Sequence, residues 1–306
     1  METTRVALTG ARGFVGRALA GALNELPGRP ISLLSISRGQ VTNQSGLLQE
    51  IGSENEELPD RLKSIKIFIY AAGKSKGTPE ELWQANVSGL QRYIDMLPAS
   101  LEQIIHFSSL NVLFPRRSAY GETKLQGEML WAASSFAGKV TVLRPALIYG
   151  PGDRQNIGRL VRLVDRFPVI PAPANGSLRP VFLQDFVDLV IGLIGQPACA
   201  GQTMVVSGAE QIKFPDLVQR LAILLGRRRV CLPLPDWFLA PVSRSARLIG
   251  LKNLSQVMDG YRLDRPWYDP SVWQHLGRST TCLDDGLRQC VDDYRVSSGK
   301  DGRIGD

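Results

Sequence analysis

The hydrophobic pattern of the first half of the chain consists of short apolar runs separated by longer amphipathic stretches. Stretches with helical patterning lie between the later runs, at 80–97 and 120–136, and another follows the first run. Strands that alternate with helices predict βαβ units and a parallel sheet covered on both faces. We therefore predict an α/β fold, a Rossmann-type doubly wound parallel sheet. Its strands are expected at 5–10, 31–36, 65–70, 103–109 and 139–145.

The second half of the chain loses this regular alternation. Connections rich in proline and glycine, such as 168–180, are mixed with helical patterns near 156–166, 184–195 and 214–225. The pattern predicts a first domain over 1–150 and a smaller, mixed C-terminal region over 151–295. The polar, glycine-rich end of the chain, 296–306, is expected to be a disordered tail.

Composition narrows the function only a little. The net charge of +7 and the pI of 9.4 are compatible with an anionic partner. The basic residues are dispersed and form no nucleic-acid motif, so we expect a small anionic ligand and no nucleic acid. The four cysteines and two histidines lack metal-ligand spacing, which argues against a metal site. No charged leader and no apolar run near ~18 residues is visible, so we expect a cytoplasmic protein.

A glycine-rich turn joins the first predicted strand to the first predicted helix. Gly10, Gly13 and Gly16 lie in the segment TGARGFVG, which ends the strand and opens the helix. Glycine allows a tight turn and a close approach of the backbone to a pyrophosphate, which the free N–H groups of the helix start then bind. The turn therefore predicts a dinucleotide site, with Phe14 and Val15 at the start of the helix.

The end of the second predicted strand bears on the choice of dinucleotide. An acidic residue there would bind the adenosine 2′-hydroxyl of NAD, but the sequence has no Asp or Glu between Glu25 and Glu50. It offers Ser37 and Arg38 instead, with Arg12 in the glycine turn as a second cation. Because arginine binds a 2′-phosphate through paired N–H donors, NADP is favoured over NAD.

Tyr120 and Lys124 are four residues apart in the segment YGETK. If this segment opens a helix, both side chains project from one face, where an ammonium group can stabilise a phenolate. Taken alone, the same spacing also describes an ordinary surface pair.

Six segments in order make the chain resemble the extended short-chain dehydrogenase/reductases, and more narrowly the NAD-dependent epimerase/dehydratase family acting on nucleotide-linked sugars. The segments are TGARGFVG (9–16), AAG (71–73), NVSG (86–89), FSSLNV (107–112), YGETK (120–124) and LRPALIYGPGD (143–153). The resemblance implies that Tyr120 is the catalytic tyrosine, that Lys124 binds the nicotinamide ribose and lowers the pKa of the tyrosine, and that Ser109 polarises the reacting carbonyl or alcohol. It also implies an NAD(P)-binding first domain, a nucleotide-sugar-binding second region and a homodimer formed through helices of the first domain.

Further positions follow from the same resemblance. It implies that Ala71, Ala72 and Lys74 lie near the cofactor, and that Asn86, Asn156, Arg179 and Arg262 lie near the substrate and its diphosphate. For Lys74 and Asn86, a structural or solvated role is equally open.

Departures from the family pattern limit the reaction. Only residues 110–119 separate Ser109 from Tyr120, a shorter loop than many relatives carry, and no carboxylate follows Ser109. Without that acid pair a dehydratase is unfavourable. A 4-keto-sugar reductase is preferred slightly to a 4-epimerase. A carbonyl reductase of non-nucleotide substrates and a non-catalytic cofactor-binding assembly or sensor protein remain the alternatives.

The basic segment 236–253 suggests membrane contact, but a packed helix with a solvated face is preferred.

Overall fold

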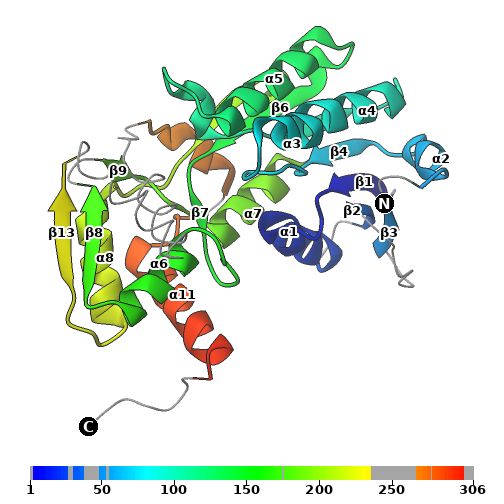
Figure 1. Ribbon diagram of the computed structural model, residues 1–306. Helices are drawn as coiled ribbons and strands as arrows, with labels where there is room; N and C mark the ends of the chain where they lie inside the picture. Colours follow the sequence, from blue (N-terminus) through cyan, green and yellow to red (C-terminus); the bar gives the residue numbers. More distant parts are fainter. Residues whose placement is uncertain are drawn as a thin grey trace. The chain divides into compact units, whose positions relative to one another are not determined.

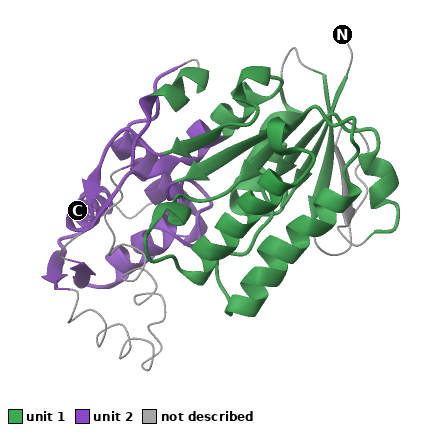
Figure 2. Ribbon diagram, turned by 90° about the horizontal axis from the view of Figure 1, so that it is seen from above, with its two compact units in different colours: residues 1–145, 187–206, 271–277 green, residues 146–186, 207–270, 278–306 purple. Residues whose placement is uncertain are grey.

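The computed structural model describes residues 3–26, 30–37, 48–52, 55–173, 176–235, 267–276 and 278–299, with backbone only for 48–52. The chain divides into two compact units (Figure 2). Unit 1 comprises residues 1–145, 187–206 and 271–277, and unit 2 comprises 146–186, 207–270 and 278–306. A single cut near residue 150 therefore does not describe the division, because two later segments belong to the first unit.

Unit 1 is built on a seven-stranded sheet with the order β11-β6-β5-β4-β1-β2-β3 (Figure 1). Every pair of neighbouring strands is parallel. This arrangement confirms the predicted Rossmann-type fold. Of its strands, only the two at the edges were not predicted, since one is partly polar and the other lies in the second half of the chain. The strands are β1 (Thr4–Thr9), β2 (Ile31–Ser37), β3 (Leu48–Gly52), β4 (Ile67–Tyr70), β5 (Gln103–Phe107), β6 (Val140–Pro145) and β11 (Thr203–Val206).

Helices cover both faces of this sheet. The core of one face joins strand residues such as Phe68 and Ile104 to Leu90 of α4 and Trp131 of α5. Helix α1 lies across the sheet from α4 and α5 (Figure 1). The helices concerned are α1 (Phe14–Asn24), α2 (Leu58–Leu62), α3 (Pro79–Trp83), α4 (Gly89–Met96), α5 (Ala119–Ala133) and α7 (Leu183–Leu193), and one π-helical turn, η1 (Gln84–Ser88), connects α3 to α4. The division between the two units falls within α7.

The turn from β1 into α1 depends on close backbone contacts that only glycine permits. Gly10 has a φ of +71°, and a Cβ there would lie 2.9 Å from the carbonyl oxygen of Ala71. A Cβ on Gly16 would lie 2.1 Å from the carbonyl oxygen of Gly10. The glycines therefore let the first turn of α1 pack directly on the end of β1.

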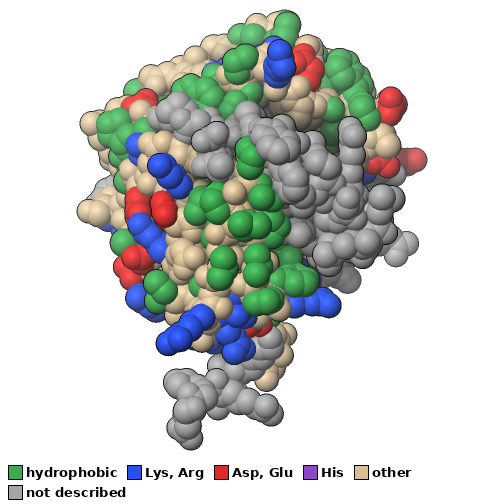
Figure 3. Space-filling view, turned by 60° about the vertical axis from the view of Figure 1, so that its left-hand side comes forward, with side chains coloured by type: hydrophobic (Ala, Val, Ile, Leu, Met, Phe, Trp, Pro, Cys, Tyr) green, Lys and Arg blue, Asp and Glu red, His purple; other side chains and the backbone are tan. Residues whose placement is uncertain are grey.

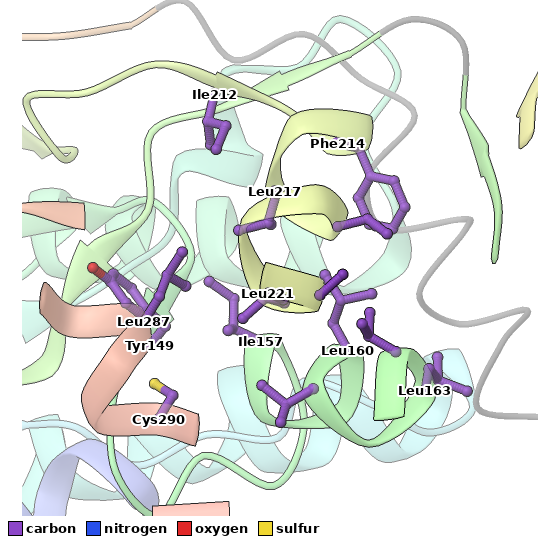
Figure 4. Packing of buried hydrophobic residues seen from close by; sticks show 14 of the residues in the cluster. Tyr149, Ile157, Leu160, Leu163, Ile212, Phe214, Leu217, Leu221, Leu287 and Cys290 are labelled. Carbon is purple, nitrogen blue, oxygen red and sulfur yellow. The ribbon is translucent and has the colours of Figure 1, made fainter. Parts of the chain in front are cut away.

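The described residues of unit 2 form a core of three helices and three pairs of short strands. Ile157, Leu160, Leu217, Leu221 and Leu287 meet in this core (Figure 4). They come from α6 (Ile157–Arg166), α8 (Phe214–Leu224) and α11 (Leu283–Ser297). The strand pairs are β7 (Ile148–Tyr149) with β10 (Val181–Phe182), β8 (Val169–Pro173) with β13 (Val230–Leu234), both parallel, and β9 (Ser177–Leu178) with β12 (Ile212–Lys213), antiparallel.

One side of the β8–β13 pair is apolar and exposed. Figure 3 brings this side of the molecule forward and shows hydrophobic side chains beside Lys and Arg side chains. Val169, Val230 and Leu232 are 48%, 60% and 48% exposed. The alternate residues Ile170 and Ala172 are buried in the core of unit 2, so β8 has the strand alternation of a half-buried sheet although both faces are apolar.

Replacing Gly16 by alanine should destabilise unit 1. The new methyl group would meet the backbone of Gly10, which has no flexible side chain to move away. We expect a loss of about 1–3 kcal/mol in the free energy of unfolding, the usual range for overpacking. Gly21→Ala in the same helix is the matched control, since nothing lies within 4 Å of its added Cβ. That variant should be neutral or stabilised by up to about 1 kcal/mol. Equal urea midpoints for the two variants would contradict this account of the turn.

Candidate functional site

Helix α5 places Tyr120 and Lys124 in its first two turns. Its N-cap is Ser118, whose hydroxyl accepts a hydrogen bond from the backbone N–H of Gly121 at 3.2 Å. A Cβ on Gly121 would lie 2.9 Å from the carbonyl oxygen of Asn111. The glycine after the tyrosine therefore allows α5 to approach the 3₁₀ turn η2 (Leu110–Leu113) closely.

Ser109 begins that 3₁₀ turn and faces Tyr120. Its hydroxyl caps η2 by accepting from the N–H of Asn111 at 3.2 Å, and it is also hydrogen-bonded to the Tyr120 side chain. Burial raises the pKa of the Tyr120 phenol above its ordinary value, and the hydrogen bond to Ser109 opposes this effect. The two hydroxyls predicted to act together are thus in contact.

The Lys124 ammonium is buried beside them. The side chain is 5% exposed, and its Nζ donates to the carbonyl oxygen of Phe107 at 2.8 Å. Burial lowers the pKa of Lys124 to about 8, while the carboxylate of Glu128 acts in the opposite direction. A Cβ on Gly73 would lie 3.1 Å from this Nζ, so glycine leaves room for the ammonium group.

The loop after β4 is attached to the site by two polar side chains. The hydroxyl of Thr9 accepts hydrogen bonds from the N–H groups of Ala71 and Ala72, both at 3.1 Å. Asn86 lies in the π-helical turn, and its Oδ1 accepts from the N–H of Lys74 at 2.7 Å. Its Nδ2 donates to the Lys74 carbonyl and to the Thr123 hydroxyl, both at 2.9 Å. Asn86 therefore joins this loop to α5 through both its amide oxygen and its amide nitrogen.

Lys74 itself lies at the surface. Its Nζ forms an ion pair with Glu81 at 2.7 Å, and the two side chains are 37% and 53% exposed. This ion pair lowers the pKa of the Glu81 carboxyl. The backbone of Lys74 is thus bound to Asn86, while its ammonium group is bound to a carboxylate.

The glycine turn has the features of a phosphate site. Helix α1 starts after Gly13 with no side-chain cap, and the first N–H groups of a helix have no partners within it. Phe14 and Val15 are half-buried in this first turn, and Arg12 is exposed. The N–H of Gly10 donates to the carbonyl oxygen of Ile36 at 3.0 Å, which brings the end of β2 and Ser37 beside the turn. These residues fit the pyrophosphate of a dinucleotide. Arg38 lies outside the described residues.

Two of the expected substrate residues lie in unit 2. Asn156 precedes α6, and its Nδ2 donates to the carbonyl oxygen of Ile148 at 3.4 Å. The Arg179 guanidinium donates to the carbonyl oxygen of Ala209 at 2.6 Å and lies 4.7 Å from the ring centre of Tyr268. Its buried Nε has no hydrogen-bond partner among the described residues. Arg262 and the segment 236–253 lie outside the described residues.

Three polar residues at these positions were not predicted. Thr9 and Glu128 were missed in unit 1, and Asp153 in unit 2. The Asp153 carboxylate accepts from the N–H groups of Gln155 and Asn156 at 2.8 and 3.0 Å and so fixes the start of α6. A signal did exist for Glu128 and Thr9: one lies a helical turn after Lys124, and the other directly precedes Gly10.

Comparisons with known proteins point to one family. The model of the NAD dependent epimerase/dehydratase family matches residues 6–172. The UDP-glucose 4-epimerase of Vibrio cholerae is 27% identical over 76% of this chain and 79% of its own length. The ceramide reductase of Caulobacter vibrioides (strain NA1000 / CB15N) is also 27% identical, over 76% of this chain and 74% of its own length. Among solved structures, UDP-glucuronic acid 4-epimerase from Bacillus cereus in complex with UDP-glucuronic acid and NAD has a similar fold. Its TM-score is 0.76 at 20% identity, over 96% of this chain and all of that one.

The described part of the chain has no membrane-spanning helix: none of its helices is both long and apolar enough to cross a bilayer.

Replacing Lys124 by methionine should stabilise the protein at neutral pH. The folded pKa of about 8 lies below the ordinary value of 10.5, so the charged lysine opposes folding at pH 7. This penalty is lost as the pH rises from about 8 to 10.5. We expect the free energy of unfolding of Lys124→Met to exceed that of the wild type by on the order of 2 kcal/mol at pH 7, and the gain to shrink by pH 10.5.

The control for this prediction is Lys66→Met. Lys66 is exposed and pairs with Glu102 at 2.6 Å, so its loss should change the free energy of unfolding by less than about 1 kcal/mol at either pH. Urea titrations at both pH values give the comparison. A Lys124→Met protein less stable than the wild type at pH 7 would show that burial does not penalise this charge.

Proposed function

Because the chain belongs to the NAD dependent epimerase/dehydratase family, we propose that it catalyses hydride transfer between NAD(P) and C4 of a nucleotide-linked sugar. The predicted resemblance to extended short-chain dehydrogenase/reductases is confirmed by the family match, and the chain is an enzyme of this type. The reaction that we put first is the reduction of a 4-keto sugar. Epimerisation at C4 is the second candidate, favoured by the similarity to the Vibrio cholerae epimerase.

One observation carries the proposal: the hydroxyls of Ser109 and Tyr120 are hydrogen-bonded just after β5, and the Lys124 ammonium donates to Phe107, the last residue of that strand, in the same unit as the glycine turn. Ligands of open parallel sheets bind at the carboxyl ends of the strands. The glycine turn and the Gly73 backbone belong to that edge of the sheet as well. A dinucleotide bound along this edge would have its pyrophosphate at α1 and its nicotinamide ribose near Lys124.

The chemistry follows from the three side chains. The cofactor supplies the hydride in reduction. Tyr120 gives a proton to the oxygen that was the 4-ketone, and Lys124 stabilises the resulting phenolate because it places a positive charge near it. Ser109 donates a hydrogen bond to the same oxygen as negative charge develops on it. For epimerisation, the same groups would work in both directions, with Tyr120 accepting the proton in the first half-reaction.

The preference for reduction over epimerisation rests on the lack of an acidic residue at the end of β2. Ser37 ends that strand, and the sequence has no Asp or Glu between Glu25 and Glu50 that would select NAD there. We propose NADPH as the preferred cofactor, with Arg38 as the residue that binds the 2′-phosphate. NADPH preference fits a reductase, which releases the oxidised cofactor after each turnover. Similar solved structures are complexes with NAD, so the affinities of this protein for NADPH and NADH have to be compared directly.

Substrate recognition is proposed for unit 2. Asn156, Arg179 and Arg262 would bind the nucleotide diphosphate, with guanidinium groups as donors of matching geometry. The Nε of Arg179 is buried and has no hydrogen-bond partner among the described residues, so a shift of this side chain would make it a donor for such a phosphate. A carbonyl reductase of non-nucleotide substrates is the competing function, because a ceramide reductase is among the relatives. Dimerisation through helices of unit 1 stays a prediction.

Tyr120→Phe should abolish turnover while cofactor binding is retained. The variant lacks the phenolic hydroxyl, so kcat for a nucleotide 4-keto-6-deoxysugar should fall by about 10²–10⁴-fold, the usual contribution of a general acid. The Kd for NADPH should change less than about threefold, because the ribose-binding lysine remains. Loss of NADPH absorbance and chromatography of the sugar product measure both effects. Undiminished turnover by Tyr120→Phe would refute the proposed mechanism. Turnover of ceramide-like ketones but of no nucleotide sugar would favour the competing function.

Arg38→Ala should lower the affinity for NADPH and leave that for NADH unchanged. Removing a charge-assisted contact to a phosphate costs about 1.5–3 kcal/mol, or roughly ten- to a hundredfold in Kd. Arg92→Ala, in α4, is the control, and Kd values for both cofactors are compared at one salt concentration. Tighter binding of NADH by the wild-type protein would overturn the NADP assignment and bring the epimerase to first place.

A further inference from the structure

A second polar network joins segments next to the three candidate catalytic residues, and its centre is the carboxylate of Glu128. Arg144 donates to it through Nε at 3.0 Å and through Nη2 at 2.6 Å. The Ser108 hydroxyl donates to the same carboxylate. The side chains of Arg144 and Glu128 are 21% and 10% exposed. This is a fork-shaped, largely buried ion pair with an added neutral donor.

Each segment that the carboxylate joins also carries part of the site. Ser108 directly precedes Ser109, and its backbone N–H donates to the carbonyl oxygen of Leu143 at 2.8 Å, beside Arg144. Glu128 follows Lys124 by one turn on the same face of α5. Glu128 therefore connects α5, the residues after β5, and β6, and two of these segments carry the three candidate catalytic groups.

The charges around Lys124 make this connection electrostatic as well as mechanical. Burial disfavours the charged ammonium, and Glu128 favours it. His106 faces the site from β5, and burial together with the charge of Lys124 lowers its pKa well below the ordinary value, so it stays neutral. Tyr120 from α5 is neutral because burial raises its pKa. On the side of the loop after β4, Asn86 and Gly73 add no charge.

We propose that Glu128, held by Arg144 and Ser108, is a positioning residue that keeps the Lys124 ammonium charged and fixes Ser109 opposite Tyr120. The inference rests on the proposed function, because it gives Lys124 the task of a cation in hydride transfer. Glu128 itself touches neither substrate nor cofactor in this role. Arg144 in turn holds the carboxylate in its ionised form and in one orientation.

A merely structural ion pair would behave differently. Either partner's loss would then lower stability and leave the pH dependence of kcat unchanged. In the proposed role the two losses act in opposite directions. Glu128→Gln removes the anion that favours the ammonium, so the midpoint of Lys124 should fall. Arg144→Gln removes a competing cation and leaves the carboxylate to Lys124 alone, so the midpoint should rise.

The test is an NMR titration of the full-length protein labelled with [13C]lysine, without substrate or cofactor. The resonance of Lys124 is identified by its loss in Lys124→Arg. We expect Glu128→Gln to lower its midpoint by about one pH unit and Arg144→Gln to raise it. Glu122→Gln is the matched control: it lies on the same helix and pairs with Arg117 at 3.0 Å, and it should leave the midpoint unchanged. Should Arg144→Gln fail to fold, Arg144→Lys keeps the charge and should keep the wild-type midpoint.

An unchanged midpoint in folded Glu128→Gln would overturn the inference, as would a shift of equal size in Glu122→Gln or Arg144→Lys. Activity gives a second measure once a substrate is found. In Glu128→Gln, kcat should fall more steeply above pH 7 than in the wild type, whereas the Kd of the cofactor at pH 6 should stay within about threefold. The proposed function is tested separately, since its failure would leave Tyr120→Phe active while the lysine titration still responded to Glu128.

Discussion

The burial of one ammonium group is the constraint around which the polar side chains of unit 1 are arranged. Lys124 is 5% exposed, and among the described residues its three N–H donors have one acceptor, the carbonyl oxygen of Phe107. A cation in such surroundings destabilises the fold unless charge and donors are arranged to receive it. Gly73 provides the space, Glu128 provides the opposing charge, and a nicotinamide ribose would supply further acceptors.

The neighbouring residues follow from the same constraint. His106 is buried, neither of its ring nitrogens has a hydrogen-bond partner in the part of the chain that the structure describes, and it stacks on Tyr70 at 5.6 Å between ring centres. A protonated histidine there would place a second cation beside Lys124, so the apolar environment that lowers its pKa also protects the site. The cost in stability and the catalytic use proposed for Lys124 thus have one physical origin, which is the removal of water from a charge.

The sequence was sufficient to predict the five inner strands of the sheet, because they depend on local patterns. The three candidate catalytic residues came from the family resemblance, and their roles stay predictions. Alternating apolar runs identified β1, β2, β4, β5 and β6, and the spacing of Tyr120 and Lys124 identified one face of α5. The sequence did not reveal the Glu128–Arg144 pair, since contacts between a helix and a strand that follows it depend on how the two pack. It also did not reveal that the Asn86 amide is hydrogen-bonded to Lys74 and Thr123, or that the Lys74 ammonium pairs with Glu81. Those outcomes are set by the π-helical turn and by the loop after β4, neither of which has a clear sequence pattern.

The most direct test of hydride transfer at C4 is the fate of deuterium from [4-2H]NADPH of the transferring face, offered together with a nucleotide 4-keto-6-deoxysugar. The account predicts one deuterium at C4 of the product sugar, located by mass spectrometry and NMR, with one NADP formed for each sugar reduced. Product without deuterium at C4 would contradict it. So would inversion of a 4-hydroxy nucleotide sugar with no net oxidation of added cofactor and no reduction of the ketone, since the enzyme would then be an epimerase.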